Sequence, residues 1–311
     1  MNPCRLLALT AFSVLLLLLL LLLLVAAPRA EEVKGAYKFT SKDIVYLQHG
    51  ERQLMATLYQ PQGSGPFAAV VEVHGGHWTS KDRFDNKNTA MTWAANGIVV
   101  LSIEFIMPPA APYPTSLQDI NYAVRWMKAH AKEFGSEPGR VGLYGTSSGG
   151  HQVLLASMRP DDPRYRTLPL KDAPDLDAHV AFVASGWGVV DPLGRYGLAK
   201  KAESKPLIEA SIQTFGNEDG MSEASPPRIL ARGEKVTLPP AFLYQGTKDK
   251  WTPVDFVQNF VDLYRKAGGQ IDLLLFQEQP HRFVNEDFSD PSSQEAIMKT
   301  AAFIKKFGAV P

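Results

Sequence analysis

The sequence predicts an α/β domain in which helices cover both faces of a mostly parallel central sheet. Two observations support this prediction. Short apolar runs that end in glycine or polar residues alternate with stretches of helical period along the chain. This alternation is typical of parallel sheets whose strands are buried on both faces. Residues 31–311 carry the pattern, and a stretch of this length fits one large α/β domain.

The first 30 residues are predicted to lie outside that domain. Arg5 precedes a strongly apolar run over residues 6–27, which ends in small residues at Ala26 and Ala27, and Ala30 follows. This order is typical of a secretory signal peptide, and the run is also long enough to cross a bilayer as an uncleaved anchor. Both alternatives place the remaining chain beyond a membrane. We therefore expect a secreted or periplasmic protein, or one attached to a membrane through residues 6–27.

Composition excludes several classes of function. Cys4 is the only cysteine, so residues 31–311 hold neither disulfides nor cysteine-based metal sites. Lysine plus arginine equals aspartate plus glutamate at 32 each, which is unlike the basic composition of nucleic-acid-binding domains. The chain lacks phosphate-loop and dinucleotide signatures, and no histidine pair stands at ligand spacing beside a carboxylate. We expect no metal, no cofactor and no nucleic-acid partner.

The first half of the domain opens with an expected antiparallel pair of strands, because two β-type runs flank turn residues at 49–51. Next comes a continuous apolar run that ends in glycines, as in a strand buried on both faces. Thr115 and Gln118 are spaced as a capping box, and apolar residues recur at helical spacing until Gly135. The elements expected here are strands at 44–47, 54–59, 67–73 and 98–105, and helices at 86–96 and 115–134.

The second half continues the alternation with one interruption. Between residues 187 and 238 the alternation of strands and helices is replaced by loops and by charged helical residues over 198–215. We interpret this stretch as an insertion over one end of the sheet, a candidate cap. The elements expected around it are strands at 141–144, 180–183, 241–245 and 271–276, and helices at 148–158, 254–266 and 294–307.

Residues 145–149 carry the pattern Gly-x-Ser-x-Gly between an expected strand and an expected helix. A serine at such a turn projects its hydroxyl from the sheet, and crowding requires small residues two before and two after it. The start of the next helix favours developing negative charge. The glycine spacing selects Ser147 over Ser148 as the candidate nucleophile. A chance match in a glycine-rich turn is the alternative.

Residues 74–78, His-Gly-Gly-His-Trp, follow the third expected strand. Glycines at this place let the backbone approach a substrate and point N–H groups at a carbonyl oxygen. We predict an oxyanion hole formed by the amides of Gly76, His77 and Ser148. Each such donor typically contributes about 3 kcal/mol in the transition state. Gly75 is expected to shape the turn, and a plain glycine turn that closes a strand is the alternative interpretation.

A serine hydroxyl needs a base, and the base needs an orienting acid. After a Gly-x-Ser-x-Gly turn the acid comes next along the chain and the histidine last. Asp249 follows the strand expected at 241–245, at the strand end where sites of open parallel sheets collect. His281 follows the last strand and is the only histidine after His179. We predict that Ser147, Asp249 and His281 form a triad, with helix capping as the alternative for Asp249 and a solvent-exposed loop residue for His281.

Further motifs accompany the triad: HGG at 74–76, a proline-rich loop at 108–114 leading into LQD at 117–119, AVRW at 123–126, RVGLY at 140–144, GTKD at 246–249 and PH at 280–281. Over residues 45–307 the chain resembles the esterase/lipase branch of the α/β-hydrolase superfamily, close to hormone-sensitive-lipase-like enzymes and bacterial acetyl- or feruloyl-esterases. The resemblance implies the α/β-hydrolase fold with a cap-like insertion. It also implies cleavage of carboxylic esters through an acyl-enzyme on Ser147, without a cofactor, on small-molecule or polysaccharide-linked substrates.

Position 77 departs from the lipase-like pattern, which commonly has a third glycine where this chain has His77. The resulting HGGxW variant also resembles arylformamidases. An amidase, arylformamidase or small peptidase with the same triad is therefore the alternative to an esterase, and a non-catalytic binding protein of this fold is a third. Trp78, Trp187 and the loop at 108–114 are candidates for lining the substrate pocket, with ordinary packing as their alternative role.

Overall fold

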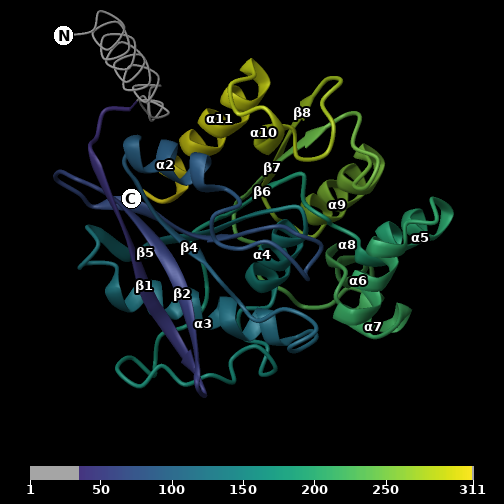
Figure 1. The fold of residues 1–311 in the computed structure, drawn as a ribbon, viewed down its shortest axis with the longest axis horizontal. Helices are drawn as coiled ribbons and strands as arrows, with labels where there is room; N and C mark the ends of the chain where they lie inside the picture. The colour runs from purple at the N-terminus through teal and green to yellow at the C-terminus, as the bar shows by residue number, and fades with distance from the viewer. Residues whose placement is uncertain (1–34, 310–311) are drawn as a thin grey trace, which may run out of the picture. The chain divides into compact units, whose positions relative to one another are not determined.

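A twisted, mostly parallel sheet with helices on both faces organises residues 35–309, the part of the chain that this computed structural model describes (Figure 1). The strand order is β1-β2-β4-β3-β5-β6-β7-β8. Strand β2 pairs antiparallel with β1 and β4, whereas every pair from β4 to β8 is parallel. The predicted α/β-hydrolase fold class is confirmed. The strands are β1 (Phe39–His49), β2 (Arg52–Pro61), β3 (Phe67–Val73), β4 (Ile98–Ile103), β5 (Ser136–Thr146), β6 (Val183–Gly186), β7 (Ala241–Gly246) and β8 (Ile271–Phe276).

Two apolar clusters hold the helices against opposite faces of the sheet. One cluster contains buried residues of α3, α4 and α9, such as Leu117, Leu154 and Phe260. The other contains residues of α2 and α11, such as Trp93 and Ile297. The helices are α2 (Lys87–Ala95), α3 (Thr115–His130), α4 (Ser148–Met158), α5 (Pro192–Lys201), α6 (Lys205–Phe215), α7 (Glu218–Glu223), α8 (Pro226–Ala231), α9 (Val254–Lys266), α10 (Phe283–Glu286) and α11 (Pro291–Phe307).

The predicted capping box at the start of α3 is wrong. Thr115 is already the first helical residue, Pro114 occupies the cap position, and no side chain caps this end. Gln118 instead donates a hydrogen bond from Nε2 to the carbonyl oxygen of Arg164, at 3.0 Å. Since the helix begins at Thr115 itself, its hydroxyl stands one position too late to act as a cap.

The position of β6 also differs from the prediction. The strand covers Val183–Gly186, not residues 180–183. It pairs along Leu143–Thr146 of β5 and along Ala241–Tyr244 of β7. Pairing with two neighbours, rather than the apolar run, therefore decides where this strand begins.

The predicted insertion at 187–238 folds into the four helices α5 to α8. Figure 1 shows them grouped at one side of the sheet, with α8 beside α9 and near α4. The proline-rich loop meets the insertion, because the backbone N–H of Tyr113 donates to the carbonyl oxygen of Thr214 at 2.9 Å. The Tyr113 hydroxyl also contacts Glu223, at 2.8 Å.

The apolar run at residues 6–27 lies outside the described residues. Within residues 35–309, none of the helices combines the length and the apolar character that a bilayer span requires. The predictions of a signal peptide or an anchor, and of export, stay predictions.

Candidate active site

Ser147 lies in a strained turn between the end of β5 and the start of α4. Its backbone has φ 51° and ψ −118°, a conformation that side chains rarely adopt and that typically stores about 1–3 kcal/mol. A Cβ on Gly145 would meet the carbonyl oxygen of Gly149, and one on Gly149 would meet backbone oxygens of Val73 and His74. The close approach explains why glycine is needed on both sides of the serine.

The three predicted triad residues meet at the carboxyl ends of their strands. The Ser147 hydroxyl oxygen is 3.0 Å from Nε2 of His281, and Nδ1 of His281 is 2.7 Å from Oδ2 of Asp249. The three side chains follow β5, β8 and β7, respectively. Serine, histidine and carboxylate thus form a hydrogen-bonded row, in which the histidine can take the serine proton.

The carboxylate of Asp249 is held by donors on both oxygens. Oδ1 accepts the backbone N–H groups of Trp251 and Thr252, at 2.8 and 3.0 Å. Oδ2 accepts from Nε2 of Gln245 and from the Thr252 hydroxyl, at 2.7 and 2.5 Å, besides His281. Burial opposes ionisation, but the hydrogen bonds from His281 and Thr252 outweigh it and lower the pKa of Asp249 below its ordinary value. The aspartate is therefore ionised at neutral pH and accepts Nδ1–H, which leaves the lone pair of Nε2 toward the serine.

The glycine loop packs directly against the nucleophile. A Cβ placed on Gly75 would stand 3.1 Å from the Cβ of Ser147. Gly76 has φ 104° and His77 has φ 58°, and the turn closes with backbone N–H groups of residues 79 and 80 donating to the carbonyl oxygen of Gly76. Within the described residues, the backbone N–H groups of Gly76, His77 and Ser148 have no acceptor. They are available to a substrate oxygen, and their role in an oxyanion hole stays a prediction.

His77 is neutral in this environment. Burial lowers the pKa of its imidazole to about 4, and the positive charge of Arg195 acts in the same direction. The side chain that replaces the third glycine of lipase-like sequences therefore adds no charge to the site.

Trp78 and Trp187 are both packed in the core. The indole of Trp78 contacts Phe215 and His151 edge-on, at ring distances of 5.0 and 5.6 Å. Trp187 packs against Tyr244 and Phe283, within the cluster on the opposite face of the sheet. Ordinary packing is the arrangement found for both residues, and their contact with substrate stays a prediction.

Two buried side chains that contact Trp78 were not assigned a catalytic role from the sequence. His151 accepts the indole N–H of Trp78 on Nδ1, at 3.1 Å, and donates from Nε2 to the carbonyl oxygen of Ala224 in the insertion, at 2.8 Å. Arg195 lies with its guanidinium 5.2 Å from the centre of the Trp78 ring. No local signal marks Arg195, because an arginine on a charged helix ordinarily indicates a solvated face.

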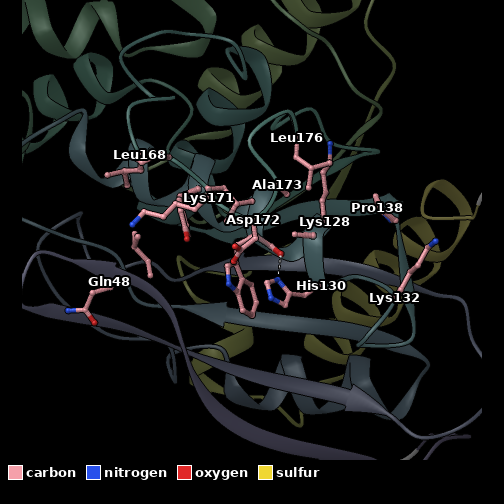
Figure 2. A pocket seen from close by; sticks show the side chains of 16 residues that line it. Gln48, Lys128, His130, Lys132, Pro138, Leu168, Lys171, Asp172, Ala173 and Leu176 are labelled. Carbon is pink, nitrogen blue, oxygen red and sulfur yellow. Dashed lines mark hydrogen bonds between the residues drawn. The ribbon is translucent and has the colours of Figure 1, made fainter.

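A hollow of about 850 Å³ lies away from these residues. Figure 2 shows that His130 and Lys128 of α3 line it together with the segment 168–176. None of the triad residues lines this hollow, so it is separate from the candidate active site. The described part of the chain also offers no group of three or more histidine, cysteine, aspartate or glutamate side chains placed to hold a metal ion.

Comparisons with known proteins agree on the type of fold. The sequence model of the BD-FAE family matches residues 56–263. The chain is 27% identical over 236 residues to LipM of Mycobacterium tuberculosis, a probable carboxylic ester hydrolase, with 73% of this chain and 52% of LipM covered. It is 27% identical over 261 residues to the carboxylesterase NlhH of that organism, with 76% of this chain and 73% of NlhH covered. This chain thus spans about half the length of LipM. The apo form of Thermogutta terrifontis esterase 2 superposes with a TM-score of 0.69 at 21% identity, covering 92% of this chain and 100% of that one.

Proposed function

Because this chain belongs to the BD-FAE family, in the esterase/lipase branch of the α/β hydrolases, we propose that it is a serine hydrolase that cleaves carboxylic esters. The observation that carries the proposal is the hydrogen-bonded row of Ser147, His281 and Asp249, with contacts of 3.0 and 2.7 Å. The names of LipM and NlhH support the same chemistry for those relatives.

The first half of the proposed reaction is acylation. Nε2 of His281 takes the hydroxyl proton of Ser147 while the serine oxygen attacks the ester carbonyl carbon. Asp249 stabilises the imidazolium that forms, because its carboxylate is ionised and accepts Nδ1–H. The imidazolium then gives its proton to the departing alcohol oxygen, and the acyl group remains on Ser147 as an ester.

The carbonyl oxygen becomes negative in the tetrahedral intermediate, and the backbone N–H groups of Gly76, His77 and Ser148 are the proposed donors. The position of the loop is fixed by the backbone N–H of Trp78, which donates to the hydroxyl oxygen of Ser148 at 3.0 Å. Each preorganised donor of this kind contributes about 3–4 kcal/mol to transition-state stabilisation.

The second half is deacylation. A water molecule loses a proton to Nε2 of His281 and attacks the acyl-enzyme carbonyl, and the same proton then returns to the Ser147 oxygen as the carboxylic acid leaves. No step needs an oxidant, a metal or another co-reactant. We propose small-molecule esters, or esters linked to a polysaccharide, as the substrates.

A fluorophosphonate probe tests the proposal, because it reacts with activated serines. We expect the full-length protein to be labelled and to hydrolyse 4-nitrophenyl acetate, and the Ser147→Ala variant to lose both properties. Ser157→Ala is the matched control, since Ser157 lies on the same helix but bonds only the carbonyl oxygen of Leu154, at 2.9 Å. Absence of labelling, or hydrolysis that survives Ser147→Ala, would contradict the proposal.

The alternative amidase is separated by rates on matched substrates. An esterase should hydrolyse 4-nitrophenyl acetate much faster than 4-nitroacetanilide or an N-formyl arylamine. If the amide or the formamide is the faster substrate, the triad serves amide cleavage instead.

A further inference from the structure

Arg195 is a fully buried arginine in the insertion. It lies on α5 and is 1% exposed. All three nitrogens of its guanidinium are buried, and none has a hydrogen-bond acceptor among the described residues. The other arginines of the same insertion differ, because Arg228 pairs with Asp191 and Arg232 pairs with Glu234.

The charge of this side chain is retained despite its burial. Burial lowers the pKa of Arg195 to about 10, and the negative charge of Asp249 opposes that shift. The guanidinium is therefore protonated at neutral pH. Asp249 does not pair with it, since the carboxylate oxygens of Asp249 accept from His281, Gln245, Thr252 and Trp251.

The guanidinium faces the glycine-loop side of the candidate active site. Its carbon is 5.2 Å from the centre of the Trp78 ring. Together with burial, its positive charge lowers the pKa of His77. Ser147 and Arg195 are both buried, at 2% and 1% exposure. The guanidinium lies beside Trp78, which follows the glycine loop that packs on Ser147, and it interacts electrostatically with Asp249. A substrate bound at the triad therefore lies within electrostatic range of Arg195.

Stability of the free protein does not account for this arrangement. Burying a cation without hydrogen-bond acceptors costs several kcal/mol, whereas a desolvated cation–π contact such as that with Trp78 returns only about 2 kcal/mol. Five N–H donors in a planar fork match the two oxygens of a carboxylate. A carboxylate against the guanidinium would supply the hydrogen-bond acceptors that Arg195 lacks.

On the basis of the esterase function proposed above, we propose that Arg195 binds a carboxylate carried by the ester substrate, so that the site favours anionic esters over neutral ones. The carboxylate belongs either to the acyl part or to the alcohol part of the ester. A neutral substrate of the same size leaves the buried cation unpaired, and this penalty creates the selectivity.

Two pairs of substrates distinguish these sources. Mono-4-nitrophenyl adipate against 4-nitrophenyl hexanoate places the charge on the acyl part, and 4-acetoxybenzoate against 4-acetoxybenzamide places it on the alcohol part. The measured quantity is kcat/KM of the anionic ester divided by that of its neutral partner. We expect wild-type protein to favour the anionic member of one pair, and Arg195→Gln to reduce that ratio by about 10- to 100-fold, the range for a hydrogen bond to a charged group.

Three further variants keep the test specific. Arg195→Lys should restore part of the ratio, because it keeps the charge but not the planar fork. Arg232→Gln, which removes an exposed arginine from the same insertion, should leave the ratio at its wild-type value. Arg195→Met removes the unpaired cation and should have a melting temperature equal to or above that of wild type.

Two results would overturn the inference. One is a wild-type ratio near one or below for both pairs; the other is an Arg195→Gln variant that slows charged and neutral esters equally. A strongly lowered melting temperature of Arg195→Met with unchanged ratios would assign Arg195 to packing. In each case, the esterase proposal would still stand if the neutral esters were hydrolysed and if Ser147→Ala abolished that hydrolysis. Absence of such hydrolysis on all four esters would instead overturn both.

Discussion

Replacing Asp249 by asparagine is expected to keep the shape of the active site and to remove most of its activity. The reason lies in the donors around the carboxylate. Two backbone N–H groups, of Trp251 and Thr252, point at Oδ1. These groups cannot turn away, so the new side chain must place its carbonyl oxygen there and its NH₂ group at the position of Oδ2.

The NH₂ group then faces Nδ1 of His281, which is 2.7 Å from Oδ2 in the present structure. Nδ1 must become the acceptor, and the proton moves to Nε2, which points at Ser147. A histidine in this tautomer cannot take the serine proton. The expected loss in kcat is about 10⁴-fold, which corresponds to about 5 kcal/mol. The new NH₂ group also meets Nε2 of Gln245, another donor, so the free energy of unfolding should fall by about 1–3 kcal/mol.

Initial rates on 4-nitrophenyl acetate between pH 6 and pH 10, together with fluorophosphonate labelling, measure the effect. Asp255→Asn is the matched control, since Asp255 is an exposed carboxylate in the first turn of α9, and it should behave like wild type. The reasoning is refuted if Asp249→Asn keeps kcat within about tenfold of wild type, or if Asp255→Asn loses as much.

Three other changes have defined outcomes. Burial raises the pKa of Glu72 to about 7, so the folded state holds a proton that the unfolded state releases at lower pH. This contribution is fully present below pH 4.5 and is lost as pH rises toward 7. Glu72→Gln should flatten that decline in chemical denaturation curves, and an unchanged slope would contradict the assignment. His151→Phe removes the hydrogen-bond partners of both Trp78 and Ala224, so it should lower the free energy of unfolding by about 1–3 kcal/mol and kcat with it; equal denaturation midpoints would refute this. Deletion of residues 1–30 should keep the protein inside a bacterial host that exports the full chain, as measured by cell fractionation, and unchanged export would exclude a signal in that stretch.

The elements predicted most accurately from the sequence are those whose environment is uniform along their length. Strand β3 is buried at every residue and α9 has one apolar face, so their expected bounds agree with the structure. Strand β1 starts five residues before the prediction, because its exposed residues 40–43 show no apolar run and join the sheet only by pairing with β2. Local pattern thus locates a core element well and an edge element poorly.

The grouping of the triad was predictable because each residue stands at the end of a strand in a fixed chain order. The burial of Arg195 was not predictable from the sequence. It accompanies the contact of the guanidinium with Trp78, a tertiary contact that no local pattern encodes. The same applies to His151, whose partner Ala224 is 73 residues away. The order of motifs along the chain identifies the catalytic residues that many α/β hydrolases have in common. Residues that contact the insertion of this chain can be identified only from the three-dimensional structure.

The proposed chemistry and the proposed selectivity lie on different parts of the chain. Ser147, Asp249 and His281 lie on turns that follow parallel strands of the sheet. Arg195 lies on α5, a helix of the insertion. The insertion is held to the rest of the domain by single hydrogen bonds, such as those of Tyr113 with Thr214 and of His151 with Ala224. Such contacts can change without disturbing the sheet. It follows that substitutions on α5 should alter which esters are accepted while the distance between the serine oxygen and the histidine nitrogen stays the same.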